Sequence, residues 1–161
     1  RRAVAMEQAL PPEIYRLLKF GFFTSGTVRN AISENTLIQG SLRAFQDDIF
    51  DHLRDGLQTI AADVEKNTGC TVKVHLAEGY PAVMNPAQVL AKVAGVAPVR
   101  MLEEPTMTSE DFSFYQRRVP GVFFFLGLGD VPALHSDNFD FDDSILLKGA
   151  DFFEKLAENF Q

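Results

Sequence analysis

The apolar run from Val119 to Leu128 places the tightest constraint on what this chain can fold into. Its side chains are hydrophobic at consecutive positions, so a strand built from them would be apolar on both faces. Such a strand is stable inside a sheet that is covered on both sides. Helices are predicted before and after it, over Pro86–Val93 and Ser144–Phe160, with a weak strand at Val99–Met101. Alternating helices and strands predict an α/β layer in this half of the chain.

The first 80 residues have a different pattern of predicted helices and strands. Residues 1–10 predict a helix that ends at Pro11-Pro12. The stretch Leu17–Phe45 predicts an antiparallel hairpin, with a break at Ser25-Gly26 and a resumed strand over Thr27–Ile32.

An amphipathic helix is predicted next. Apolar residues recur at helical spacing from Phe45 to Val64, and Gly69 supplies a stop. The alternation over Thr71–Ala77 then predicts a half-exposed strand. We therefore expect an α+β layer in residues 1–80, followed by an α/β layer in residues 81–161.

The charge balance narrows the function classes. The 22 acidic residues outnumber the 15 basic ones, for a net charge of −7. Nucleic-acid binding requires a basic face, and so does binding to an anionic membrane surface. We expect neither partner. No apolar run approaches a membrane span and no signal peptide is visible, which predicts a cytoplasmic protein. The single cysteine, Cys70, predicts a core residue at a strand edge and no disulfide.

Four polar residues are candidates for chemistry. His135 follows the strand predicted over Val119–Leu128, where α/β enzymes place their reactive groups. One histidine is one metal ligand, however, whereas a catalytic zinc site uses about three protein ligands. Asn30 and Arg43 lie on the predicted hairpin, and Ser109 lies in a turn before a predicted helix start. Each has a plainer interpretation: a loop histidine, polar residues on an open sheet face, and a helix cap.

Several segments, in this order, resemble the zinc-dependent amidohydrolases of the aminoacylase, hippurate hydrolase and auxin-conjugate hydrolase type. They are Thr24–Ile32 with its Asn, Gln39–Phe45 with Gly-x-x-Arg, Met107–Phe114 around Ser-Glu-Asp-Phe-Ser, and Leu134–Ser136 followed by Phe139–Asp143. The resemblance implies that residues 1–80 are the tail of an inserted lid or dimerisation domain. Residues 81–161 would be the C-terminal half of an α/β metallopeptidase-like catalytic domain.

The resemblance also implies roles for the candidates. His135 would hold a divalent metal, which is zinc in this family, with manganese or cobalt as alternatives. Asn30, Arg43 and Ser109 would bind the substrate, an N-acyl amino acid or a small peptide. The family's other metal ligands and its general-base glutamate have no counterpart in this sequence.

We therefore expect the chain to be part of an amidohydrolase and to be inactive alone. Two alternatives stay open. One is a non-catalytic dimerisation or binding module that forms a homodimer through an open sheet edge. The other is an acidic α/β domain that has lost the family's role.

Overall fold

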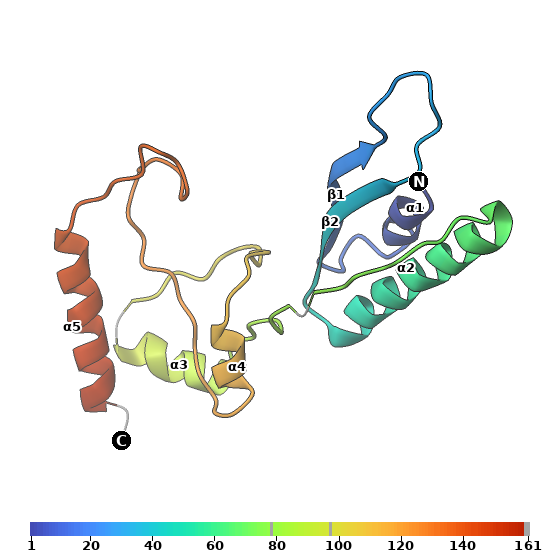
Figure 1. Cartoon of the computed structure of the whole chain (residues 1–161). Helices are drawn as coiled ribbons and strands as arrows, with labels where there is room; N and C mark the ends of the chain where they lie inside the picture. The colour runs from blue at the N-terminus through green and yellow to red at the C-terminus, as the bar shows by residue number, and fades with distance from the viewer. Residues whose placement is uncertain (78, 97, 160–161) are drawn as a thin grey trace. The chain divides into compact units, whose positions relative to one another are not determined.

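The computed structural model of the protein describes residues 1–77, 79–96 and 98–159, and it has the mixed α/β composition expected from the sequence (Figure 1). The chain forms two compact units. Unit 1 comprises Arg1–Ala82 together with Glu104–Asp111, and unit 2 comprises Val83–Glu103 together with the chain from Phe112 onward. The lid and catalytic assignments of these units stay predictions.

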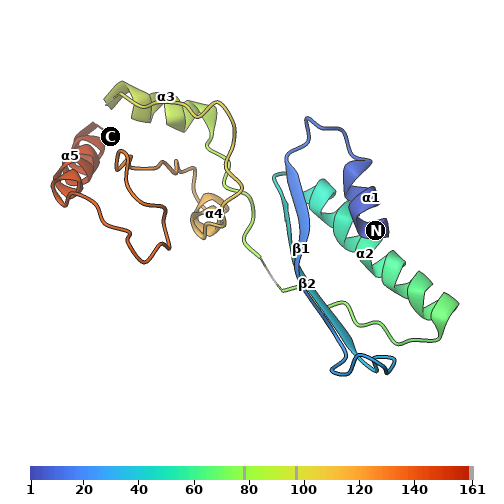
Figure 2. The same ribbon diagram turned by 90° about the horizontal axis from the view of Figure 1, so that it is seen from above.

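Unit 1 is built on an antiparallel hairpin of β1 (Arg16–Ser25) and β2 (Thr36–Ala44). The ladder runs from the pair Arg16 and Ala44 to the pair Ser25 and Thr36, whose hydroxyl oxygens lie 2.7 Å apart. The register shifts between Phe20 and Phe22, so β1 carries one extra residue. Figure 2 shows α1 (Arg2–Gln8) and α2 (Asp47–Thr68) on the same side of this hairpin.

The ladder decides which side chains meet the helices. Residues paired across an antiparallel ladder project from the same face, and neighbours along a strand project from opposite faces. Leu18 pairs with Leu42 and is 7% exposed, so this face is the covered one, where Leu53 of α2 is fully buried. Arg43 pairs with Leu17 and therefore projects from the opposite face.

The guanidinium of Arg16 fastens the start of β1 to α1. It donates to the carbonyls of Pro11 at 2.7 Å, Ile14 at 2.8 Å, Glu7 at 2.9 Å and Leu10 at 3.0 Å. Its Nε lies 3.0 Å from a carboxylate oxygen of Glu7, an ion-pair distance without hydrogen-bond geometry. Carbonyls at a helix C-terminus have no partner inside the helix. Of the four carbonyls, that of Glu7 belongs to α1 and the other three lie in the turn that follows, so Arg16 fixes the turn that brings the chain from α1 into β1.

Helix α2 begins and ends as the sequence predicts. Asp47 and Asp48 lie in its first turn, where carboxylates interact favourably with the helix dipole. Gly69 adopts φ +73° directly after Thr68, and its N–H donates to the carbonyl of Glu65 at 2.9 Å. The predicted glycine stop is confirmed.

Unit 2 contains α3 (Ala87–Val96), α4 (Phe112–Gln116) and α5 (Ser144–Asn159). Aromatic rings pack against one another in this unit, although its buried side chains among the described residues are Val93 and Ser113. The ring of Phe124 lies 4.8 Å from that of Phe152 and 5.8 Å from that of Phe153, and Phe112 lies 5.8 Å from Phe123. These contacts connect α4 and α5 to the segment between them. Phe160, the last residue of the helix predicted over Ser144–Phe160, lies outside the described residues.

The sequence predicts several strands that the structure does not contain. Thr27–Ile32 falls within the connection between β1 and β2, and Thr71–Ala77, Val99–Met101 and Val119–Leu128 run without strand structure. A strand exists only beside a hydrogen-bonded neighbour, and these segments have no strand neighbour among residues 1–77, 79–96 and 98–159. Cys70, expected in the core, is exposed, because the strand it would begin is not formed.

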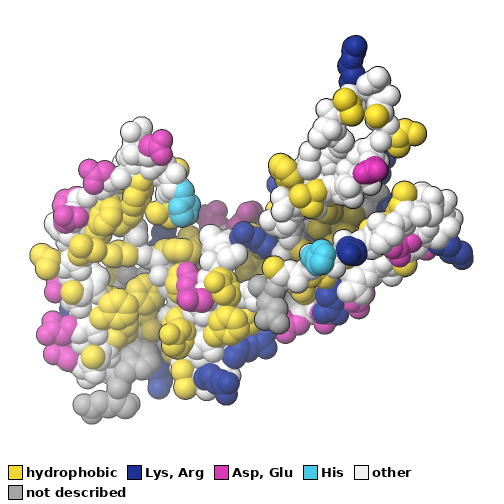
Figure 3. Space-filling view, viewed as in Figure 1, with side chains coloured by type: hydrophobic (Ala, Val, Ile, Leu, Met, Phe, Trp, Pro, Cys, Tyr) yellow, Lys and Arg dark blue, Asp and Glu magenta, His cyan; other side chains and the backbone are white. Residues whose placement is uncertain are grey.

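The unpaired apolar segment leaves hydrophobic side chains at the surface of unit 2. Phe125 is 57% exposed and Leu126 is 43% exposed. Figure 3 shows hydrophobic side chains gathered on the surface of the unit that contains α5. The covered central strand predicted from the sequence is therefore not present as such.

Replacing Gly40 should weaken the hairpin. A Cβ at Gly40 would lie 2.8 Å from Cδ1 of Phe20 and closer still to the carbonyl oxygen of Lys19, which is backbone and cannot move aside. We expect G40A to lower the free energy of unfolding by about 1–3 kcal/mol, as overpacking does. Chemical denaturation measures this.

The control is G21A. A Cβ at Gly21 would meet no atom within 4 Å. We expect this variant to lie within about 0.5 kcal/mol of the parent. Equal losses in the two variants would contradict the close approach at Gly40.

Candidate functional site

Arg43 is the candidate with the clearest surroundings. It lies near the end of β2, is half-buried, and donates a hydrogen bond from Nη1 to the main-chain carbonyl of Met107. Among the described residues, no carboxylate lies within ion-pair distance of its guanidinium. A half-buried cation without a carboxylate partner is suited to bind an anion.

Ser109 belongs to the same part of unit 1 as the Met107 carbonyl. The stretch Glu104–Asp111 is part of that unit, so the structure brings the segment of Ser109 to Arg43. Ser109 itself is exposed. It is no helix cap, because α4 begins three residues later, at Phe112.

Asn30 lies elsewhere on the hairpin. It is exposed in the connection beyond the terminal pair of Ser25 and Thr36. Arg43 lies seven positions along β2 from Thr36, which corresponds to about 23 Å at the usual rise of a strand. Within one copy of the chain, Asn30 and Arg43 therefore do not meet the same small group.

His135 lies in unit 2, in a tight turn. The N–H of Ser136 donates to the carbonyl of Ala133 at 3.0 Å, and His135 between them adopts φ +68°. It is the one non-glycine residue with positive φ in the described part of the chain. Such a conformation is unfavourable for most side chains with a Cβ, and His is among the residues that adopt it more often.

The acidic residues after His135 are used locally. A carboxylate oxygen of Asp140 accepts from the N–H of Phe141 at 2.9 Å, and one of Asp142 accepts from the N–H of Ser144 at 2.9 Å. The bond from the Ser144 main chain is the largest cause of the lowered pKa of Asp142, relative to its usual value of 3.8. These two carboxylates fix the entry into α5.

The residues that the structure describes do not fit a complete metal centre. No group of three or more His, Cys, Asp or Glu side chains among them is placed to hold an ion. His135 offers one imidazole, and a metal centre needs about three ligands. The other two histidines, His52 and His75, are exposed.

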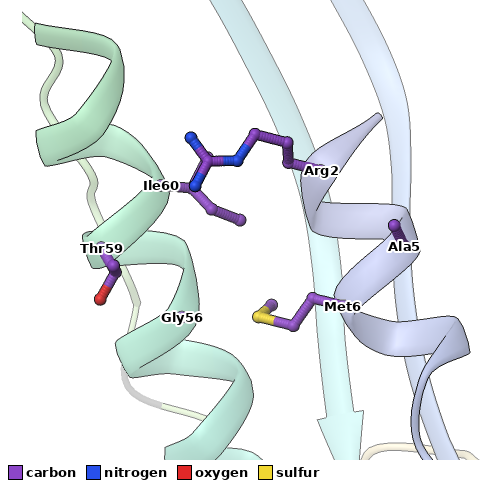
Figure 4. A pocket seen from close by; sticks show the side chains of 6 residues that line it. All are labelled: Arg2, Ala5, Met6, Gly56, Thr59 and Ile60. Carbon is purple, nitrogen blue, oxygen red and sulfur yellow. The ribbon is translucent and has the colours of Figure 1, made fainter.

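A groove lies between α1 and α2, with a volume of about 380 Å³ (Figure 4). It is lined by Arg2, Ala5, Met6, Gly56, Thr59 and Ile60. Its charged group, Arg2, is already paired with Asp63 at 2.7 Å. None of the four candidate residues lines this groove, and the one hydroxyl in its lining, that of Thr59, donates to the carbonyl of Asp55 at 2.9 Å. We assign no chemistry to it.

A comparison with protein families shows which family the chain belongs to. The family model described as peptidase family M20/M25/M40 matches residues 7–159. The chain belongs to this family. The matched range contains all four candidate residues and extends over both units.

The curated relatives are hydrolases by name. An uncharacterized hydrolase of Staphylococcus aureus (strain bovine RF122 / ET3-1) is 30% identical over 158 residues, covering 90% of this chain and 41% of the relative. An uncharacterized hydrolase of Staphylococcus saprophyticus is 28% identical over 156 residues, covering 89% and 40%. The chain thus spans about two fifths of the curated relatives it matches.

A crystal structure with a similar fold is also known. The crystal structure of a proposed aminohydrolase from methicillin-resistant Staphylococcus aureus matches with a TM-score of 0.75 at 22% identity. The match covers 96% of this chain and 42% of that one. In the described part of this chain, no helix combines the length and apolarity that crossing a membrane requires.

Two substitutions at His135 test whether its left-handed backbone conformation lowers the stability of the protein. Glycine adopts φ +68° without strain, whereas alanine does not. We expect H135G to be as stable as the parent or more so, and H135A to be less stable than H135G by about 1 kcal/mol. Thermal unfolding of the three proteins measures this. Equal stabilities of H135A and H135G would contradict the left-handed turn.

Asp142 should make the thermal stability of the protein depend on pH. Because folding lowers its pKa, its contribution is fully present above the usual value of 3.8 and is lost as the pH falls through the lower value. We expect D142A to lower the melting temperature at pH 7 and to make little difference near pH 2. D142N keeps an oxygen acceptor for Ser144 but lacks the charge, so it should lower the melting temperature at pH 7 less than D142A does, and this difference from the parent should shrink as the pH falls. A loss in D142A that is the same at both pH values would contradict the cap.

Proposed function

We propose that this chain is the part of a metal-dependent amidohydrolase that binds the carboxylate end of its substrate. The substrate class is an N-acyl amino acid or a small peptide, as for enzymes of the aminoacylase and hippurate hydrolase type. Membership of the M20/M25/M40 family and the hydrolase names of the curated relatives support the reaction class. The half-buried, carboxylate-free guanidinium of Arg43 is the observation that carries the proposal.

Arg43 suits a carboxylate for geometric reasons. A guanidinium offers five N–H donors in a planar fork, and two parallel donors match the two oxygens of a carboxylate. One N–H from Nη1 is directed to the Met107 carbonyl, which holds the group in one orientation. The remaining donors stay available to a substrate. The exposed hydroxyl of Ser109, two residues after Met107, is a further proposed contact. Asn30 is proposed from the family resemblance, as a contact made by a different copy of the chain, because within one copy it does not reach the group bound by Arg43.

His135 is proposed as one ligand of a divalent metal, with zinc as the first candidate and manganese or cobalt as alternatives. In such hydrolases the bound metal activates water as the nucleophile. The described residues do not complete a metal centre. We expect the chain alone to bind carboxylates without hydrolysing amides. In this proposal unit 1 is lid or dimerisation domain and unit 2 is the C-terminal half of the catalytic domain.

A second candidate function is self-association into a homodimer. The sheet has two strands, so both β1 and β2 present an outer edge without a strand neighbour in the described part of the chain. Exposed apolar residues accompany these edges, namely Phe22, Phe23, Leu37 and Ile38. A mass that rises with concentration in sedimentation experiments would support this function, and a constant monomer mass would contradict it.

Removing the Arg43 guanidinium should abolish carboxylate binding. We expect hippurate to shift the NMR signals around Arg43 in the parent chain and not in R43A. R43K keeps the charge but loses the fork, so its affinity should fall by about tenfold. Titration followed by two-dimensional NMR measures both.

Two controls make this test specific. Lys19 pairs with Ser41 and projects from the same face as Arg43, so K19A should leave the affinity within about twofold. The neutral amide of hippurate lacks the carboxylate and should not bind. Equal binding of hippurate and its amide would contradict the proposed role of Arg43.

A further inference from the structure

The side chain of Asn85 bonds to the main chain of Phe123 with both ends of its amide. Its Nδ2 donates to the Phe123 carbonyl at 2.8 Å, and its Oδ1 accepts from the Phe123 N–H at 2.9 Å. A neighbouring residue in an antiparallel sheet makes the same exchange, accepting from the N–H and donating to the carbonyl of one residue. The amide of Asn85 therefore does what a strand neighbour would do at this position.

Gln116 extends this arrangement along the same edge. Its Nε2 donates to the carbonyl of Gly121 at 2.9 Å and lies 3.4 Å from Oδ1 of Asn85. Its Oε1 accepts from the N–H of Met84 at 3.0 Å. Gly121 and Phe123 are two residues apart and are both bonded from one side, which is the alternation of an extended chain. We call Asn85 and Gln116 together the amide clamp.

The opposite edge of the segment has no comparable support. The main-chain groups of Val122, Phe124 and Leu126 have no hydrogen-bond partner within the described ranges 1–77, 79–96 and 98–159. The ring of Phe124 packs against Phe152 at 4.8 Å, which fixes the segment from one face. Ring packing alone leaves the segment free to slide, because it is not directional. The directional constraint comes from the clamp.

We propose that Asn85 is a positioning residue whose neutral amide replaces a strand neighbour and, with Gln116, fixes the course of the segment Gly121–Gly129. The chain runs from this segment into the turn of His135. The inference rests on the proposed function only for the role of that turn. The role proposed for Asn85 requires one donor and one acceptor that face Phe123 together. An amide provides both, and an ionised carboxylate does not.

N85D tests this requirement. At pH 7 the introduced carboxylate accepts from the Phe123 N–H but cannot donate to the Phe123 carbonyl. When protonated it regains a donor. Asn85 is exposed, so the new charge has little desolvation cost of its own. We expect the carbonyl ¹³C signal of Phe123 to move to lower frequency in N85D at pH 7 and to return as the pH falls through about 4, the usual range of an exposed Asp.

A control and a second variant complete the experiment. N138D adds the same charge at an exposed loop position and should leave the Phe123 signals unchanged. N85A removes both bonds, and we expect the Phe123 N–H to exchange with solvent about fivefold faster or more, while the amides of α2 keep their rates. This measurement does not depend on the protein remaining folded in acid.

The outcomes separate the inference from the proposed function. A parent-like Phe123 carbonyl signal in N85D at both pH values would overturn the inference, as would a change in N85D that acid does not reverse. Unchanged exchange in N85A would overturn it too. A His135 imidazole signal that does not respond to Zn²⁺ in the parent chain would count against the proposed metal role and leave the clamp standing.

Discussion

The antiparallel ladder between β1 and β2 is the interaction on which unit 1 depends. It creates the covered face where Leu18 lies, against which α1 and α2 pack, and it directs Arg43 away from them. Arg16 acts where the ladder begins, by bonding to the carbonyl of Glu7 in α1 and to three carbonyls of the turn between α1 and β1. The position of the candidate guanidinium thus follows from strand pairing, and the Met107 carbonyl then fixes its orientation.

The parts of the fold that were predicted correctly are those with local causes. Helix α2 follows from helical periodicity, acidic residues in the first turn and a glycine stop, all within a short stretch of sequence. The segments Thr71–Ala77 and Val119–Leu128 have strand-like sequences but are not strands. A strand takes its hydrogen bonds from another segment, and alternation along one segment does not reveal whether that neighbour is present.

Some features of the candidate site could also be predicted from the sequence, and others could not. Arg43, Ser109, Asn30 and His135 could be singled out from residue type and family resemblance. The carbonyl of Met107, 64 residues from Arg43, could not be predicted, because a main-chain group carries no sequence signal. Asn85 directly precedes the helix predicted over Pro86–Val93, and only the structure shows its amide bonded to Phe123. The left-handed backbone of His135 also lacks a signal, since glycine is the usual residue there.

The extra residue in β1 has a consequence for the phenylalanines beyond it. Phe20 pairs with Gly40, but Phe22 pairs with Gln39 and Phe23 with Ile38, so odd and even positions exchange sides at Gly21. Phe23 therefore shares the helix-facing side with Leu18 and Phe20, and Phe22 shares the side of Arg43. Deleting Gly21 would make the ladder regular and leave Phe22 paired with Gln39, on the side from which Arg43 projects. A regular strand that kept Gly21 would instead turn over the far half of β1 and bring Phe23 to that side.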